Sequence, residues 1–268
     1  MYFVDQVLAR RLEMGHTWRS VHHARAYQHM HPDARVKIEA AGPGFAIFEK
    51  PGSPLNRCSG LGMDGPVDAA TIDFVEVFYR ACHEPAHISL CPLADPSLKE
   101  MLRERGYRLE HFYTVLARHL PIAEGLAELP EGVLIRRMTP EMAELWLDTV
   151  AGGFSAPHEP DEEMLDILGS NFYAANAITF LAYIDHQPAG GGGMYLHGGV
   201  AEFGGASTLL PFRRRGVQTA LLQARLQAAR LEGCDTGMVL TSPGSHSQRN
   251  LQRLGFEVAY SLAIMVSE

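Results

Sequence analysis

The sequence predicts a mixed α/β fold in two domains, and three observations favour it. At 268 residues the chain has room for two domains of ordinary size. Segments that alternate polar and apolar residues, as strands do, are interleaved with segments that have the three-to-four-residue spacing of helices. A stretch punctuated by proline and glycine, 121–132, separates the two halves. We therefore expect one domain over 1–125 and a second over 131–268.

The composition excludes several classes of protein. With 46% hydrophobic and 20% charged residues, the chain has enough apolar material for its cores. The formal net charge of -8 provides no basic field for nucleic acid, so no nucleic-acid partner is expected. We find no membrane-spanning run and no signal-peptide layout, and expect a cytoplasmic protein with no membrane partner.

Cysteines and histidines give no metal site. The four cysteines are scattered without a paired spacing, and we expect free thiols. His22, His23, His29 and His31 form a dense group, but no cysteine or carboxylate is placed beside them to complete a metal site. We expect these histidines to be exposed and the protein to hold no metal.

Turn residues and periodicity place the elements of the first half. Helices are expected over 4–14, 66–79 and 98–105, and strands over 35–40, 45–48, 86–90 and 107–116. Gly15 is expected to end the first helix. The succession of helix, glycine and aromatic strand start at 105–107 recurs at 254–256. Internal duplication and chance recurrence both remain open.

The second half begins with a strand, two helices and several antiparallel strands. The strands are expected over 133–137, 178–184, 194–196 and up to 208–210, with helices over 140–150, where Thr139 can be the cap, and 162–168. A long helix over 217–231, a strand over 234–240, a helix over 247–254 and a strand over 256–266 complete the order.

The segment 202–232 carries the strongest functional signal. A strand turns through 213–218 into the long helix, and Gly216 allows close approach of the backbone to a ligand. A helix that opens on a glycine turn presents several backbone N–H groups at its positive end, where an anion can bind. The alternative interpretation is a solvated run of arginines before an ordinary helix.

The hexapeptide Arg213-Arg214-Arg215-Gly216-Val217-Gln218 resembles the phosphate-binding signature of the GNAT acetyltransferase superfamily. That signature is Arg or Gln, two residues, Gly, one residue, then Gly or Ala, and Gln218 departs from it. The order of elements over 133–266 also resembles the family. The resemblance implies an N-acetyltransferase that transfers acetyl from acetyl-CoA to a primary amine of a small molecule by direct attack. The first half resembles the same fold without the arginine and glycine turn, which implies a degenerate, non-catalytic domain.

The resemblance also implies a cofactor site formed by a strand end, the turn and the final helix. Its expected residues are Ala206, Ser207, Thr208, Arg213, Arg214, Arg215, Gly216, Val217, Gln218, Thr219, Ser247 and Asn250.

Amine acetylation needs a neutral amine and a proton for the leaving thiolate. An alkylamine with a pKa of about 10.4 is mostly protonated at neutral pH, so a base or desolvation of the amine is needed. Glu202, on the strand before the turn, is the first candidate, and a surface carboxylate is its alternative. Many family members have a tyrosine that protonates the leaving thiolate at the position where this chain has Leu251. Tyr260 is a substitute candidate, with a core tyrosine as the alternative.

A second class of function stays open. Leu251 and the lack of an assured base are compatible with a non-catalytic acyl-CoA-binding or interaction module. Association as a homodimer also stays open.

Overall fold

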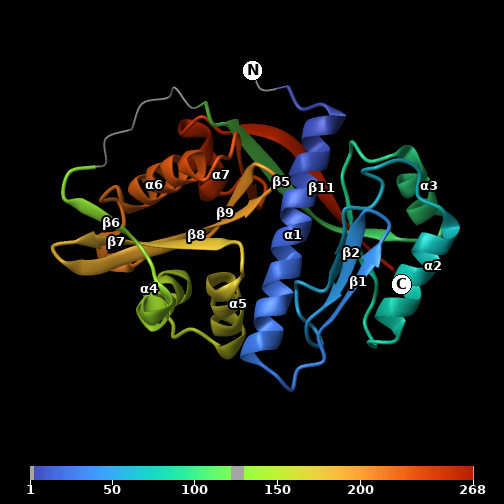
Figure 1. Cartoon of the computed structure of the whole chain (residues 1–268), viewed down its shortest axis with the longest axis horizontal. Helices are drawn as coiled ribbons and strands as arrows, with labels where there is room; N and C mark the ends of the chain where they lie inside the picture. The colour runs from blue at the N-terminus through green and yellow to red at the C-terminus, as the bar shows by residue number, and fades with distance from the viewer. Residues whose placement is uncertain (1–2, 122–129, 268) are drawn as a thin grey trace. The chain divides into compact units, whose positions relative to one another are not determined.

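The computed structural model describes residues 3–121 and 130–267 and divides into two compact units (Figure 1). Unit 1 comprises Met1–Ala24, His31–Arg118 and Met238–Glu268, and unit 2 comprises Arg25–Met30 and His119–Gly237. The end of the chain thus groups with its first half. Most of the expected boundary, 122–129, lies outside the described residues. The domains at 1–125 and 131–268 stay a prediction.

Unit 1 is built on a mixed sheet with the strand order β1-β2-β3-β4-β11-β5. Neighbouring strands are antiparallel except β3 and β4, which are parallel. Its elements are α1 (Gln6–Met30, which ends in unit 2), β1 (Lys37–Ala41), β2 (Gly44–Phe48), β3 (Arg57–Ser59), α2 (Ala69–Arg80), β4 (His87–Leu90), α3 (Pro96–Glu104), β5 (Arg108–His119), α7 (His246–Arg253) and β11 (Glu257–Val266). The last strand of the chain therefore lies between β4 and β5 of the first half.

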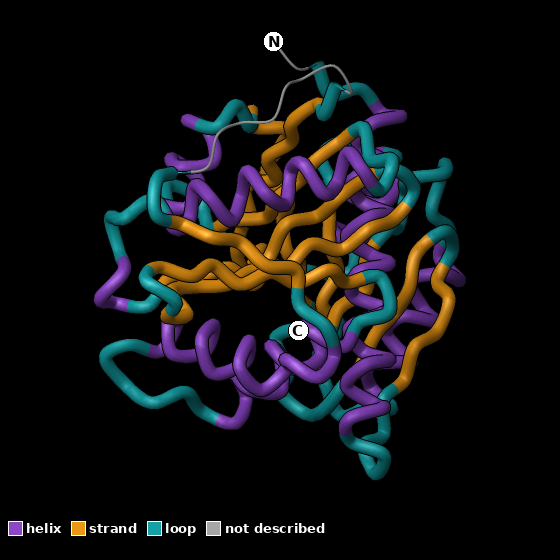
Figure 2. Tube along the Cα trace, turned by 60° about the vertical axis from the view of Figure 1, so that its left-hand side comes forward, coloured by secondary structure: helices purple, strands orange, loops and turns teal. Residues whose placement is uncertain are grey.

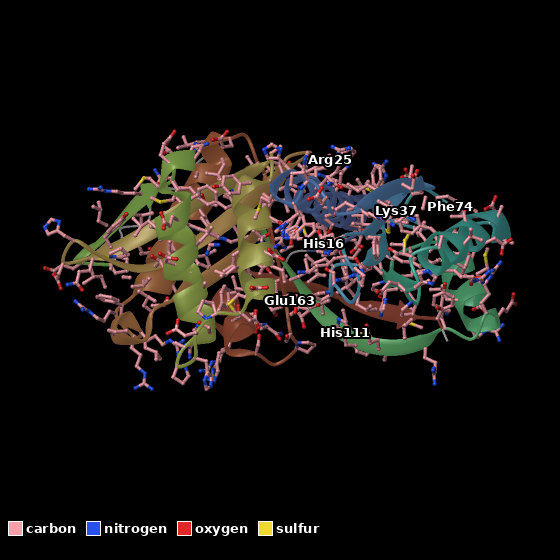
Figure 3. All side chains as sticks on the ribbon, turned by 90° about the horizontal axis from the view of Figure 1, so that it is seen from below. His16, Arg25, Lys37, Phe74, His111 and Glu163 are labelled. Carbon is pink, nitrogen blue, oxygen red and sulfur yellow. The ribbon has the colours of Figure 1, made fainter. Side chains whose placement is uncertain are left out.

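An apolar core joins this sheet to α2 and α3. Ile72 and Val75 of α2 and Leu98 and Leu102 of α3 are buried against strand residues such as Ile88. On α1, Val21 and Ala24 form a second cluster with Ile47 of β2. Figure 3 labels two exposed side chains of this unit, Phe74 of α2 and His111 of β5.

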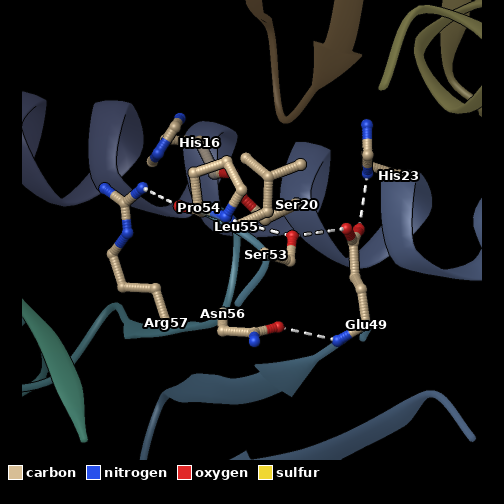
Figure 4. A network of polar contacts seen from close by, with 9 residues as sticks. All are labelled: His16, Ser20, His23, Glu49, Ser53, Pro54, Leu55, Asn56 and Arg57. Atoms are coloured by element: carbon tan, nitrogen blue, oxygen red, sulfur yellow. Dashed lines mark hydrogen bonds and ion pairs between the residues drawn. The ribbon is translucent and has the colours of Figure 1, made fainter. Parts of the chain in front are cut away.

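A buried polar network joins α1 to the segment after β2 (Figure 4). Nδ1 of His23 lies 2.6 Å from Oε1 of Glu49, and the Ser53 hydroxyl donates to the other carboxylate oxygen at 3.3 Å. The side-chain oxygen of Asn56 accepts a hydrogen bond from the backbone N–H of Glu49 at 2.9 Å. His23 is 4% exposed, so the expectation that this histidine is exposed was wrong. No group of three potential ligands among the described residues could hold a metal ion.

Unit 2 has an antiparallel sheet in the order β9-β8-β7-β6. Its elements are β6 (Val133–Arg137), α4 (Ala143–Ser155), α5 (Glu162–Tyr173), β7 (Ala177–Ile184), β8 (Gln187–His197), β9 (Val200–Thr208) and α6 (Val217–Leu231). Short 3-10 turns, Pro140–Met142 and Leu210–Phe212, precede α4 and α6, and β10 (Thr236–Thr241) straddles the two units. In Figure 2, the strands of this unit lie between a helix above and helices below.

The core of unit 2 lies between its sheet and α4 and α5. Trp146 is fully buried beside Phe172 and Leu181, and its indole N–H donates to the Phe180 carbonyl at 3.1 Å. No described helix in either unit is long and apolar enough to cross a membrane.

Most elements expected from the sequence are confirmed, with four differences. The strand expected over 194–196 spans Gln187–His197. The first helix continues through the buried Gly15 to Met30, because packing outweighs the local preference of glycine to end a helix. The short strand Arg57–Ser59 was not expected. Thr139 makes no capping hydrogen bond, and a 3-10 turn begins there instead of the α-helix.

Candidate functional site

The turn between β9 and α6 has a backbone suited to an anion. Gly216 occupies the position before the first residue of α6 and has φ +81°, in the left-handed region that favours glycine. Arg214 also has a positive φ, 64°, which is unusual for a residue with a side chain. Successive turn and left-handed conformations direct backbone N–H groups into one concavity, where negatively charged groups bind.

The start of α6 differs from that of four other helices. A side chain accepts a backbone N–H at the start of α2, α3, α5 and α7; these caps are Asp68, Asp95, Asp161 and Ser245. Gly216 has no side chain, and no side chain caps α6. The first backbone N–H groups of α6 therefore have no side-chain acceptor, as at the start of α4, and an external anion can take that place. In unit 1, by contrast, the Asp68 carboxylate occupies the start of α2.

The three arginines of the turn have different surroundings. Arg213 donates through Nε to the carbonyl of Thr208 at 3.2 Å and through Nη2 to the carbonyl of Gly153 at 3.0 Å. Arg215 lies 3.4 Å from the Asp185 carboxylate and over the ring of Phe212, and all three arginines are exposed. Arg213 thus joins the turn to the end of α4. The exposure of the arginines agrees with a solvated run, whereas the contacts of Arg213 and Arg215 are specific, so both interpretations stay open.

The end of β9 packs closely against α4. The hydroxyl of Ser207 donates to the carbonyl of Val150 at 2.7 Å. A Cβ on Gly153 would collide with Ser207, so glycine is required there. Ala206, Ser207 and Thr208 are all partly exposed. These contacts hold the strand end in place while leaving part of its surface accessible to a ligand.

A β-bulge interrupts β9 just before this strand end. Gly191 pairs with Ser207 and Gly193 pairs with Gly204, so two residues of β9 lie opposite the single residue Gly192. The first of those two residues is Gly205, which has φ +55°. One class of β-bulge has a glycine in the left-handed conformation as the first of its two bulged residues. In any bulge, one residue does not take part in the regular hydrogen bonding between the strands. The backbone polar groups at this bulge can therefore form hydrogen bonds with a ligand.

Glu202 is buried, not on the surface. It is 1% exposed and pairs across the strands with Tyr195 of β8. Its neighbour Phe203 lies beneath Arg225 of α6, and successive strand residues point to opposite faces. The Glu202 side chain therefore points to the face away from α6. The surface-carboxylate interpretation was wrong, and the role as a base stays a prediction.

Tyr260 lies in unit 1 and resembles a core tyrosine. Its hydroxyl donates to Oε1 of Glu13 at 2.7 Å, and it is 6% exposed. Burial raises its pKa well above the usual value, and the charge of Glu13 adds to this increase. A phenol in these surroundings gives up its proton less readily, so the site does not favour it as the acid. Ser247 and Asn250, both on α7, also fall in unit 1; the first is exposed and the second partly buried.

The sequence analysis missed Arg225 as a part of this region. The helical spacing of apolar residues over 217–231 predicted a plain amphipathic helix, yet Arg225 is 3% exposed on its buried side. Leu231, the apolar residue at the end of this helix, is 81% exposed. The available signal was the position of Arg225 four residues after Leu221, on the same face of the helix.

Comparison with known proteins agrees with this geometry. Residues 140–256 match the model of the acetyltransferase (GNAT) family. The chain therefore carries a domain of the GNAT acetyltransferase family and is an acyltransferase. No curated protein matches the chain in sequence.

Solved structures extend the similarity in fold. A GCN5-related N-acetyltransferase from Kribbella flavida matches with a TM-score of 0.68 at 19% identity, covering 100% of this chain and 96% of that one. One from Sphaerobacter thermophilus has a TM-score of 0.55 at 19% identity, with coverages of 74% and 67%. A tandem GNAT protein from the clavulanic acid biosynthesis pathway has a TM-score of 0.56 at 15% identity, with coverages of 88% and 78%. The predicted mixed α/β fold is confirmed.

Proposed function

We propose that the chain is an N-acetyltransferase that binds acetyl-CoA at the turn 213–219 and acetylates a primary amine of a small molecule. The single observation that carries the proposal is the start of α6, where a left-handed Gly216 leaves the helix without a side-chain cap. The pyrophosphate of coenzyme A is an anion of the kind that such a helix start attracts. Arg214, exposed on the turn, adds a positive charge.

The β9 bulge and Glu202 support the chemical step. In the proposed reaction the neutral amine nitrogen attacks the thioester carbon, and the carbonyl oxygen becomes negatively charged. The C–S bond then breaks as the carbonyl re-forms, and the departing thiolate takes up the second proton that the nitrogen loses, directly or through water, to give the amide and the free thiol. The backbone N–H that the bulge frees from the ladder is suited to stabilise that oxygen. Glu202 accepts the amine proton, directly or through water, so that the nitrogen attacks in its neutral form.

Unit 1 has a different role in this proposal. The helix that follows β3, α2, is capped by Asp68, whose carboxylate accepts the Thr71 amide and hydroxyl. A carboxylate at this helix start repels a phosphate and occupies the hydrogen-bond donors that a phosphate would use. We therefore assign the coenzyme pyrophosphate to the start of α6, not to the start of α2, and treat the first half, 1–125, as non-catalytic.

The test compares two glycines at opposite ends of α6. Gly216 and Gly233 both have φ +81°, so Gly216→Ala and Gly233→Ala carry a similar backbone strain. A Cβ at Gly216 would lie 2.9 Å from Cβ of Pro130, whereas one at Gly233 meets nothing within 4 Å. We expect Gly216→Ala to raise the Kd for acetyl-CoA about tenfold, or ~1.4 kcal/mol, by calorimetry. Gly233→Ala should leave the Kd unchanged.

A turnover measurement distinguishes an acetyltransferase from a non-catalytic binding module. Release of the free thiol is followed with acetyl-CoA and a panel of small primary amines. Turnover with any of these amines supports the proposal. Binding at the turn without turnover would identify a non-catalytic acyl-CoA-binding module. Equal Kd values for the two glycine variants and the unaltered protein would remove the coenzyme from the turn.

A further inference from the structure

We propose that Arg225 is a positioning residue that fixes the β9 bulge and thereby aims the backbone N–H that stabilises the thioester oxygen. The proposal rests on the proposed function and goes beyond it, because Arg225 itself touches neither the coenzyme turn nor Glu202 in the described contacts.

The guanidinium of Arg225 holds the two strands on either side of the bulge. Its Nη1 donates to the carbonyl of Gly193 on β8 at 3.0 Å and lies 3.5 Å from the carbonyl of Gly204 on β9. These two glycines are the cross-strand pair immediately before the bulge. Nε donates to the carbonyl of Leu221, one turn earlier in α6. One side chain thus connects the helix, the bulged strand and its partner.

The residue opposite the bulge is a glycine because Arg225 occupies the space above it. A Cβ on Gly192 would lie 3.0 Å from Nη1 and 3.1 Å from Cζ of Arg225. The same Cβ would lie 3.0 Å from Cβ of Ala206, the second residue of the bulge. The guanidinium therefore lies directly over the bulge, in contact distance of the backbone that the reaction is proposed to use.

Stability alone gives no reason for an arginine at this position. Burying a cation costs free energy, and apolar replacements of similar size are often neutral or stabilising. Burial lowers the pKa of Arg225 to about 10, so the side chain remains protonated at neutral pH. Phe203, whose ring centroid is 5.7 Å from Cζ, faces the cation from β9. A cation retained here at such a cost is explained by the geometry that it imposes on the bulge.

The experiment compares Arg225→Met with Gln227→Met on the same helix. Methionine keeps the length and apolar character of the stem but cannot donate to the Gly193 and Gly204 carbonyls. We expect Arg225→Met to lower kcat about 10² fold, as the loss of one oxyanion donor does, with the KM and Kd for acetyl-CoA within about twofold. Gln227→Met should leave all three unchanged. An unchanged kcat in a folded Arg225→Met protein would overturn the proposal.

A second measurement does not depend on turnover. Acetyl-CoA carries a thioester carbonyl that CoA lacks. In NMR spectra of the ¹⁵N-labelled protein, the amide chemical shifts of Gly205 and Ala206 should therefore differ between the two ligands. We expect this difference to be lost in Arg225→Met, and its persistence would contradict the role of Arg225. If neither ligand binds the unaltered protein, the proposed function fails instead.

A third variant moves Arg225 without removing it. Gly192→Ala places a methyl group against the guanidinium and the bulge, and it should lower kcat like Arg225→Met if the bulge geometry matters. This variant keeps the proposal testable if Arg225→Met does not fold. An unaltered kcat in Gly192→Ala would count against it.

Discussion

Glu202 and Arg225 are buried charged residues that lie on opposite faces of the same strand pair. Arg225 acts from α6, over Phe203, whereas Glu202 points to the other face. Sequence patterns assign charged residues to the surface, because burial depends on what packs over them. In the sequence, Glu202 is therefore a candidate only because of its place before the turn, and no local pattern distinguishes Arg225.

Replacing Glu202 by glutamine tests its role as the base. Glu202→Gln keeps the size of the side chain but removes its capacity to accept a proton at neutral pH. We expect kcat to fall about 10² fold, with the largest loss at lower pH, where less amine is neutral in solution. The Kd for acetyl-CoA should not change.

Glu232→Gln is the matched control, because Glu232 pairs with Arg137 at a partly exposed position after α6. It should leave kcat unaltered. An identical pH–rate profile for Glu202→Gln and the unaltered protein would exclude Glu202 from the mechanism.

The turn before α6 combines anchoring and charge in adjacent arginines. Both Arg213 and Arg214 are exposed, and Arg213 also anchors the turn to α4 through the Gly153 carbonyl. The sequence predicted the turn and the helix, because glycine and apolar spacing are local signals. It did not predict which arginine is structural, because that depends on the position of α4 in space.

The salt dependence of the Kd for acetyl-CoA distinguishes the roles of Arg213 and Arg214. Arg213→Ala removes hydrogen bonds to two carbonyls, and we expect the Kd for acetyl-CoA to rise about tenfold at all salt concentrations. Arg214→Ala removes an exposed charge, so its smaller effect, about threefold at low salt, should disappear at high salt because exposed charges are screened. The measurement is calorimetric titration at two salt concentrations. Equal salt dependence of the two variants would contradict this division of roles.

Elements with local signals were predicted better than those made by pairing. The hairpin of β1 and β2 and the strand β6 follow the expected spacing. The three residues of β3 have too little sequence for a pattern and are held by pairing with β2 and β4. The glycine run 190–193 favours a strand bulge over close approach by a ligand, and the structure has a bulge in β9 opposite Gly192. The bulged residues themselves, Gly205 and Ala206, were not predicted, because register is a property of two strands.

Two helices that each follow a strand, α2 and α6, differ in the capping of their N-termini. Asp68 caps α2 in unit 1, whereas Gly216 leaves α6 in unit 2 without a side-chain cap. The placement of β11 between β4 and β5 shows that order along the chain did not predict which segments pack together. Long-range pairing of this kind leaves no local pattern in the sequence.

Hydrogen–deuterium exchange of the whole chain with and without acetyl-CoA tests the central claim most directly. Binding at the start of α6 predicts slower exchange over 204–208 and 213–219, with no change over 60–72 at the start of α2. Slower exchange confined to 60–72, or no change at the turn under saturating acetyl-CoA, would contradict the assignment of the coenzyme to the start of α6.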